Sequence, residues 1–435
     1  MEKFVTEKSK ALFEEGKKYL VDGVSSSFHV APCEEYPIAM IRGKGARMYD
    51  IDGNEYIDYI AGFGPTILGY APDALNEAVA DQLTRGVQFS TPTEALYKLA
   101  KKLTEIIPCA EMVSFQSSGT EANMHAWRVA RAATGKMKIV KFEGQYHGWA
   151  DEQKITIGAD NTEQLGARTN ITRIMTTAGQ RKSTTDDIIL APWNDIDTLT
   201  KIVEENADEI AAVLMEPYMC DEGPILGKEG YLEAVRELCT KNNVLLIFDE
   251  VITGFRMSLG GAQEYFGVTP DIGIFGKAIA GGISLSMIAG KKEHMELCHP
   301  SGTFNATPVA VAASLATIAE LEKPGTYERM DALGAQLCDA FIRLGKENGI
   351  KTYANHHNGI SQFQFGIDRA PEDWRDVLDN VDSDMYDKFY NLCRDYGVRL
   401  TSMRGREYLS AAHTQEDIDR TIAVFEHVFP MLKEA

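Results

Sequence analysis

A single lysine lies in an otherwise apolar stretch of the chain, residues 270–290. After Asp271, Lys277 is the only charged side chain of this stretch, and its neighbours are Ile, Phe, Ala, Ser and Gly. An ammonium group removed from water tends to lose its proton, and the neutral amine is a nucleophile toward carbonyl compounds. The stretch therefore suggests that Lys277 forms a Schiff base with a carbonyl group.

Two carboxylates end the apolar run "LLIFDEV", residues 245–251. Strand pleating sends Asp249 and Glu250 to opposite faces, so one can face a site while the other pairs elsewhere. Asp249 is a candidate partner for a protonated heterocyclic nitrogen, with Val251 on the same face as an apolar wall for the ring. The alternative is that loop N–H groups hold both carboxylates at a strand end.

A candidate anion site follows the strand-like segment 112–116. Gly119 permits close approach of backbone N–H groups, Ser118 and Thr120 add hydroxyls, and a helix that begins here favours negative charge. The alternative is an ordinary N-cap and turn. The segment lacks the Lys-Ser/Thr ending of a P-loop, which argues against ATP hydrolysis.

The loop "FEGQYHGW", residues 142–149, offers a flat ring at Tyr146 for stacking. His147 is either a residue of the same site or a structural histidine. Together, an amine, an acid, a stacked aromatic and an anion cup are what pyridoxal 5'-phosphate requires of a protein. We therefore expect this cofactor.

Short apolar strands alternate with helical segments from about residue 90. The expected strands are 112–118, 138–142, 210–217, 244–251, 271–276 and 284–290. Such alternation predicts an α/β fold, with a mainly parallel sheet that helices cover on both faces. Ligands of such sheets bind at the carboxyl ends of the strands, where the candidate residues lie.

Three segments make up the expected domain organisation. Residues 61–320 form a large cofactor-binding α/β domain, and residues 321–435, charged and helical with a few strands, form a smaller domain. Residues 1–60 join the smaller domain, because the hairpin predicted at 46–60 needs a partner to bury its face.

Composition excludes several other classes of function. The net charge of −20 argues against nucleic acid or an anionic membrane as a partner. The seven cysteines are scattered, without CxxC spacing, which predicts reduced thiols in a cytoplasmic protein and no metal site. No apolar run reaches membrane-spanning length.

As a set, several motifs resemble the class III, fold-type I pyridoxal-phosphate aminotransferases. The branch is that of glutamate-1-semialdehyde aminomutase and the β-amino-acid aminotransferases, and the resemblance extends over about residues 20–420. The matching segments are "RMYDIDGNEYIDY", "GPTILGYAP", "SSGTEANMHAWRVARAATG", "KFEGQYHGW", "MEP", "LIFDEVITGFR", "PDIGIFGKAIAGGI", "SGTFNATPVAVAA" and "LSAAHTQEDID".

The resemblance implies a seven-stranded-type sheet and a homodimer with its active sites at the subunit interface. It implies that Lys277 is the Schiff-base lysine and proton shuttle, and that Asp249 binds the ring nitrogen. The other implied cofactor contacts are a stacking Tyr146, a backing Val251, the nearby His147 and Glu216, the phosphate ligands Ser118, Gly119 and Thr120, and Thr303 from the other subunit.

Departures from the aminomutase pattern concern the substrate. His29 stands where the aminomutase has a carboxylate-binding arginine, Phe63 replaces a tryptophan, and Gly405 replaces a glutamate. Arg404 matches an arginine that binds a substrate carboxylate in β-amino-acid aminotransferases. The alternative for Arg404 and Arg406 is surface charge.

The expected activity is transamination between a small-molecule amino donor and a keto acid acceptor, through Lys277. The alternative is an isomerase with the same site, either a 2,1-aminomutase or an amino-acid epimerase. A third reading, a fold that serves only binding, is disfavoured because both Lys277 and Asp249 are present.

Overall fold

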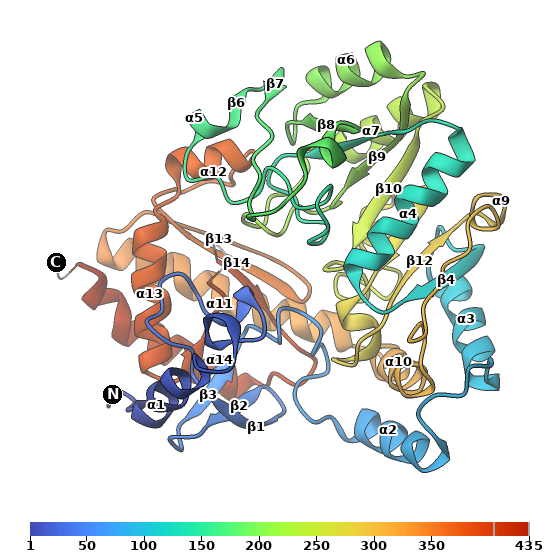
Figure 1. The fold of residues 1–435 in the computed structure, drawn as a ribbon. Helices are drawn as coiled ribbons and strands as arrows, with labels where there is room; N and C mark the ends of the chain where they lie inside the picture. Colours follow the sequence, from blue (N-terminus) through green and yellow to red (C-terminus); the bar gives the residue numbers. More distant parts are fainter. Residues whose placement is uncertain (403–404, 434–435) are drawn as a thin grey trace. The chain divides into compact units, whose positions relative to one another are not determined.

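The chain folds into two units. The computed structural model describes residues 1–402 and 405–433 (Figure 1). The larger unit contains residues Ala74–Pro324 and Ala370–Asn380, and the smaller one contains Met1–Asp73, Gly325–Arg369 and Val381–Ala435. Each unit is described by itself below.

A seven-stranded sheet is the framework of the larger unit. In spatial order its strands are β4 (Met112–Gln116), β12 (Ser286–Gly290), β11 (Ile272–Phe275), β10 (Leu245–Glu250), β9 (Ile210–Met215), β5 (Lys138–Phe142) and β8 (Ile188–Ala191). All neighbouring pairs from β11 to β8 are parallel, whereas β12 is antiparallel to both β11 and β4. The predicted mainly parallel α/β sheet is confirmed, and β8 is a strand that the sequence analysis did not include.

Helices cover the sheet because its strands are apolar on both faces. All six residues of β9 are buried, and the helix α4 (Gly119–Thr134) packs its face of Ala122, Ala126 and Trp127 onto the sheet. The other helices of this unit are α2 (Asp73–Arg85, with Asp73 in the smaller unit), α3 (Glu94–Ile106), α5 (Thr162–Leu165), α6 (Ile196–Asn206), α7 (Tyr231–Lys241), α8 (Ala262–Phe266), α9 (Lys292–Met295), α10 (Pro308–Leu321) and α12 (Trp374–Asn380), and a short hairpin joins β6 (Gly166–Ala167) to β7 (Asn170–Ile171). None of the helices among residues 1–402 and 405–433 is long and apolar enough to cross a membrane.

Two small sheets and four helices build the smaller unit. One sheet has the order β1 (Met40–Lys44), β2 (Arg47–Asp50), β3 (Glu55–Asp58) and β15 (Val398–Arg399), and the other has β13 (Thr352–His357), β14 (Ile360–Phe365) and β16 (Arg406–Tyr408). The helices are α1 (Glu7–Gly16), α11 (Thr326–Asn348), α13 (Ser383–Asp395) and α14 (Gln415–Val428). The predicted hairpin at 46–60 is confirmed as the antiparallel pair β2–β3.

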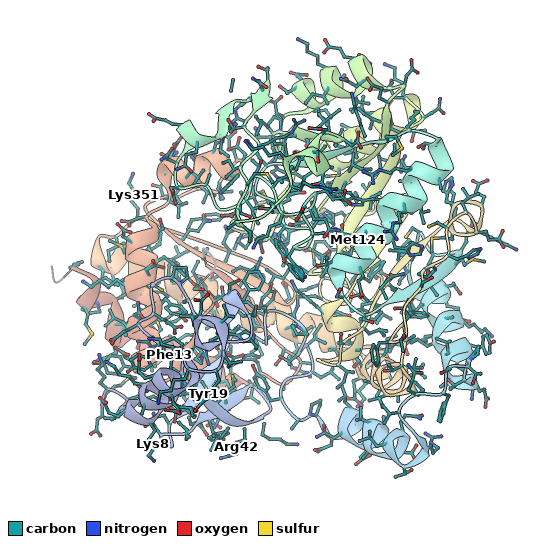
Figure 2. The ribbon with its side chains drawn as sticks, viewed as in Figure 1. Lys8, Phe13, Tyr19, Arg42, Met124 and Lys351 are labelled. Carbon is teal, nitrogen blue, oxygen red and sulfur yellow. The ribbon has the colours of Figure 1, made fainter. Side chains whose placement is uncertain are left out.

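The turn of this hairpin also caps the first helix. Asp52 accepts hydrogen bonds from the backbone N–H groups of Lys8 at 2.8 Å and Ser9 at 3.0 Å, near the start of α1 (Figure 2 labels Lys8). The next residue, Gly53, has a φ of 99°, which glycine adopts without strain. The acidic turn thus has a structural role, because it satisfies N–H groups that the helix itself leaves unpaired.

Side-chain contacts extend the smaller unit beyond the expected boundary at residue 60. The segment 61–73 belongs to it because Asp58 accepts from Ala61 N and from the Tyr70 hydroxyl, both at 2.8 Å. Conversely, residues 370–380 belong to the larger unit, where Arg375 forms a bidentate ion pair with Glu143 at 2.7 and 2.8 Å.

An aromatic cluster forms the centre of the smaller unit's core. Phe341 on α11 packs against five other phenylalanine rings, with centroid distances from 4.9 to 6.5 Å, and most of these contacts are edge-to-face. Its partners are Phe363, Phe365, Phe389, Phe425 and Phe429. They lie on β14, on α13, on α14 and directly after α14, so the ring of Phe341 connects these parts of the unit.

The substitution Phe341→Ala is expected to lower the free energy of unfolding by about 3–5 kcal/mol, because it opens a large cavity in this cluster. Urea denaturation, followed by circular dichroism, measures the change. The control is Ile342→Ala at the next position of the same helix, which is 43% exposed. It is expected to change the free energy by less than about 1 kcal/mol, and equal losses in the two variants would contradict the assignment of Phe341 to the core.

Candidate active site

Asp249 lies at the carboxyl end of β10 and is 4% exposed. Its Oδ2 accepts from Asn123 Nδ2 at 2.9 Å and from His147 Nδ1 at 2.8 Å, and its Oδ1 accepts from Val251 N at 3.0 Å. The carboxylate is therefore fixed in place by three donors from three segments of the chain.

Glu250, the neighbouring carboxylate, points to the other face of the strand, as pleating predicts. It accepts from the backbone N–H groups of Ala262 and Gln263, at 2.5 and 3.0 Å, and from the Thr253 hydroxyl at 2.8 Å. Glu250 thereby caps the start of α8, where Ala262 and Gln263 lie. Glu250 thus has a structural role that is separate from the surroundings of Asp249.

His147 and Asn123 each retain a buried polar atom without a hydrogen-bond partner. These atoms are His147 Nε2 and Asn123 Oδ1. With its Nδ1–H donated to Asp249, the imidazole carries its free acceptor on Nε2. Burial lowers the pKa of His147, although the hydrogen bond to Asp249 opposes this shift. Unsatisfied buried atoms beside an ordered carboxylate are typical of a site that a polar ligand completes.

Glu216, at the end of β9, fixes the loop that carries Tyr146 and His147. Its Oε1 accepts from Tyr146 N at 2.9 Å, its Oε2 accepts from Cys220 N at 2.6 Å, and its own N–H donates to Gln145 Oε1 at 2.9 Å. Burial, and to a lesser extent the nearby Asp221, raises the pKa of Glu216 to about 8. The stacking residue expected at Tyr146 is thus held through its backbone.

Lys141 is a buried residue of the same region that the sequence analysis did not single out. Its Nζ donates to the carbonyl oxygen of Gln145 at 2.5 Å, and its side chain is fully buried. Burial lowers the pKa of Lys141 to about 8, against the attraction of carboxylates led by Glu216 and Asp221. The signal was the same as for Lys277, because Lys141 is a lysine inside the apolar strand "KIVKF".

Lys277 follows β11 after one glycine and has a left-handed backbone, with φ of 46°. Such a conformation costs of the order of 1–3 kcal/mol for a residue with a side chain and occurs often at active sites. Because β10 and β11 are parallel, with Asp249 opposite Ile274, Lys277 and Asp249 emerge at the same edge of the sheet. The expected amine and acid therefore come from neighbouring strand ends.

The start of α4 adjoins the same group of residues. Ser118 is the N-cap and accepts from Glu121 N at 3.3 Å, and Gly119 and Thr120 open the helix. A Cβ at Gly119 would lie only 3.4 Å from both Val251 methyl groups. Thr120 Oγ1 accepts from Trp149 N at 3.3 Å, two residues after His147. A helix N-terminus this close to Asp249 and Val251 fits an anionic group on an aromatic ring.

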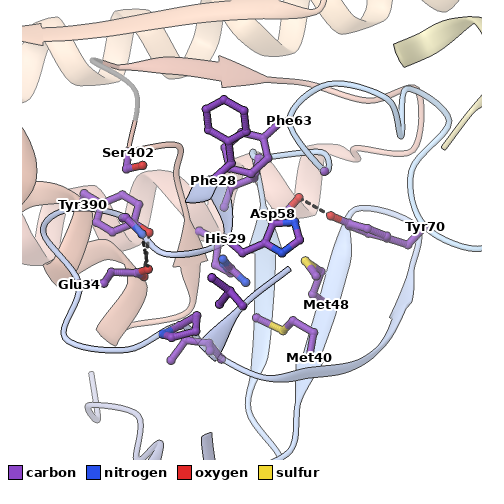
Figure 3. A pocket seen from close by; sticks show the side chains of 17 residues that line it. Phe28, His29, Glu34, Met40, Met48, Asp58, Phe63, Tyr70, Tyr390 and Ser402 are labelled. Carbon is purple, nitrogen blue, oxygen red and sulfur yellow. Dashed lines mark hydrogen bonds between the residues drawn. The ribbon is translucent and has the colours of Figure 1, made fainter. Parts of the chain in front are cut away.

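The remaining candidates lie elsewhere. Thr303 is exposed, and its carbonyl oxygen accepts from Gln88 at 2.6 Å. His29 and Phe63 belong to the smaller unit and line one pocket there (Figure 3). Arg404 lies outside the described residues. The surface-charge expectation is wrong for Arg406, which is 1% exposed on β16 with its guanidinium 5.4 Å from the Tyr408 ring.

The chain is similar in sequence and in fold to known proteins. Residues 30–354 match the family model described as aminotransferase class-III. The glutamate-1-semialdehyde 2,1-aminomutase of Methanocaldococcus jannaschii is 41% identical over 98% of this chain and 99% of its own. An ω-transaminase from Sphaerobacter thermophilus superposes with a TM-score of 0.91 at 30% identity, over 98% of each chain. A transaminase solved with PLP bound gives 0.87 at 27% identity, over 99% of this chain and 98% of its own.

The fold and the site residues define a fold-type I enzyme with pyridoxal 5'-phosphate as its cofactor. The chain belongs to the class III aminotransferase family. The recognition made from the sequence motifs is therefore confirmed at the level of the family, the fold and the cofactor.

The substitution Glu216→Gln is expected to change how stability depends on pH. In the native protein the carboxyl, with a pKa of about 8, keeps its proton to higher pH than in the unfolded chain, where its pKa is about 4.5. Between pH 5 and pH 8 the wild type therefore loses stability through this group, whereas the variant does not.

Urea denaturation at a series of pH values tests this expectation. The free energy of unfolding of the variant should rise relative to that of the wild type as the pH increases from 5 to 8. The other titrating groups are common to both proteins and cancel in the difference. A difference that is constant across this range would show that the carboxyl of Glu216 does not have a raised pKa.

Proposed function

We propose that this protein is an isomerase that moves an amino group between positions of one substrate molecule, in the manner of a 2,1-aminomutase. The observation that carries the proposal is the 41% identity to a glutamate-1-semialdehyde 2,1-aminomutase over nearly the full length of both chains. This comparison favours the isomerase alternative over the transamination expected from the motifs. Both reactions would use the same residues around the cofactor.

The cofactor supplies an aldehyde carbon that takes up an amine and a ring that accepts electrons when its nitrogen is protonated. Asp249 would bind that N–H, since His147, Asn123 and Val251 N fix the orientation of its carboxyl group. The N-terminus of α4, with Ser118, Gly119 and Thr120, would bind the phosphate. Tyr146 would pack on the ring, and Val251 would support its other side.

Lys277 would carry out two tasks. Its amine would hold the cofactor until the substrate amine replaces it, and it would then move a proton between carbon atoms as a general base and acid. Removal from water and a nearby cationic ring favour the neutral amine that both tasks need. The left-handed backbone at Lys277 would orient this side chain.

A transaminase is the second candidate, and Gly405 is the observation that favours it. The resemblance implies a glutamate at this position in the aminomutase, whereas Gly405 has a φ of 76°. A Cβ here would lie 1.8 Å from the carbonyl oxygen of Phe363, so the backbone path excludes any side chain.

We further propose a homodimer with Thr303 reaching the partner's site, and a cytoplasmic location.

The substitution Lys277→Ala is expected to lower turnover by at least about 10³-fold, because it removes the covalent attachment and the proton carrier. Borohydride reduction followed by peptide mass spectrometry should find the cofactor fixed to position 277 in the wild type only. The control, Lys291→Ala, changes an exposed lysine and should leave both results unchanged. A variant at position 277 with full turnover would contradict the role of the lysine.

The requirement for a second carbonyl substrate distinguishes the two candidates. Without an added keto acid, the isomerase should convert many equivalents of an amino substrate per active site, whereas a transaminase stops after about one. Glutamate-1-semialdehyde and a panel of α- and β-amino acids serve as probes, with products measured by chromatography. Turnover that depends strictly on pyruvate or another keto acid would exclude the isomerase.

A further inference from the structure

The smaller unit contains a pocket that the cofactor chemistry does not use. It has a volume of about 450 Å³ and lies against the hairpin β1–β2, the turn after β3, and the segment 24–38 (Figure 3). Its walls are mostly apolar and are formed by Phe28, Ile38, Met40, Met48, Ile60 and Phe63. A cavity of this size and lining fits an organic molecule with an apolar body.

Two aromatic rings form one wall of the pocket. Phe28 and Phe63 lie 5.8 Å apart between centroids and are tilted by 48°. Phe63 has a φ of 66°, unusual for a bulky residue, and its N–H donates to Ile60 O at 2.8 Å. Asp58 stabilises this turn by accepting a hydrogen bond from Ala61 N. Phe63 therefore adopts a strained backbone conformation in which its ring lines the pocket.

The two carboxylates at the pocket are already engaged by protein donors. Asp58 accepts from the Tyr70 hydroxyl and from Ala61 N, both at 2.8 Å. Glu34 accepts from the Tyr390 hydroxyl at 2.8 Å and from Arg394 at 3.1 Å (Figure 3 shows the bonds from both tyrosines). Neither acid therefore needs a ligand.

Arg399 differs from these two acids. It lies on β15 opposite Asp58 on the parallel strand β3, and it lines the pocket. Among the described residues, its guanidinium has neither an ion pair within 4.0 Å nor a hydrogen bond, although a guanidinium has five N–H donors. Burial alone would lower the pKa of Arg399, but Tyr390, Asp58 and Glu34 outweigh it, so the group stays charged.

We propose that this pocket binds the carboxylate of an amphipathic organic acid, with Arg399 as its partner and the Phe28–Phe63 wall against its apolar body. A guanidinium forms two parallel hydrogen bonds with a carboxylate, which satisfies several unused donors at once. A phosphate would call for more positive charge than the guanidinium of Arg399 supplies among the described residues of the pocket. An ammonium ligand would face Arg399 and find both carboxylates already occupied.

The inference concerns a ligand of the smaller unit and goes beyond the proposed function. His29 also lines the pocket, and the resemblance implies a carboxylate-binding arginine at its position in the aminomutase. Arg399 would supply a cation from another strand. The binding itself does not depend on any reaction.

Calorimetric titration of the cofactor-loaded protein tests the binding. The probe is 3-phenylpropionate, which lacks an amine, and its neutral match is 3-phenylpropanamide. A charged hydrogen-bonded pair should make the acid bind about 10- to 100-fold more tightly than the amide in the wild type. In Arg399→Met this preference should vanish, and in Arg399→Lys it should be reduced.

Two further variants separate the charge from the apolar wall and from general effects. Phe28→Ala, at a ring that is 42% exposed, should weaken the acid and the amide to the same extent. Arg42→Met makes the same chemical change on exposed β1 and should leave the preference unchanged (Figure 2 labels Arg42). Circular dichroism and the melting temperature establish that each variant is folded.

The proposal is overturned if the acid and the amide bind equally to the wild type, or if Arg399→Met keeps the preference for the acid. It is supported if the preference disappears in folded Arg399→Met alone. Failure of the proposed function is a different result, namely an intact preference for the acid in a protein that transfers no amino group.

Discussion

The burial of one carboxylate determines how the site of the larger unit is assembled. Burying the carboxyl group of Asp249 is costly unless donors surround it, and the donors come from its own strand end, from the loop after β5 and from α4. Satisfying this group therefore draws three separate segments to one point. The residues expected to bind the ring and the phosphate lie on those same three segments, so their arrangement follows from the needs of a single charge.

Two further buried groups, Lys141 and Glu216, stabilise the loop that carries His147. Lys141 and Glu216 both act on the loop residues 145–147, the former through the Gln145 carbonyl and the latter through Gln145 and Tyr146 N. Burial of each group is costly, and the carboxyl group of Glu216 is one of those that oppose the loss of charge on Lys141. The loop is thus held at its backbone, next to the hydrogen bond of the His147 side chain with Asp249.

The sequence predicted those features that local patterns encode. The strands, the hairpin β2–β3, the candidate lysine and the candidate acid each depend on a short run of residues with a clear alternation or an isolated charge. It did not predict the contact of Asn123 with Asp249, the burial of Arg406, or the role of Arg399, because these depend on which strands become neighbours. Lys141 has the same local signal as Lys277, and only the tertiary structure shows that its side chain is enclosed.

The type of reaction is a further feature that the sequence patterns do not decide. The motifs favoured transamination and the relatives favour isomerisation, and the residues around the cofactor are compatible with both.

Gly405 has a consequence for the residues that this position can hold. The Phe363 carbonyl oxygen occupies the space of a Cβ at position 405, and the Phe363 N–H donates to Gly405 O at 2.8 Å, so the two segments meet without room for a larger residue. Any other residue at position 405 therefore requires a different course of the main chain. A difference at this position between two sequences would thus mark a difference of backbone as well as of side chain.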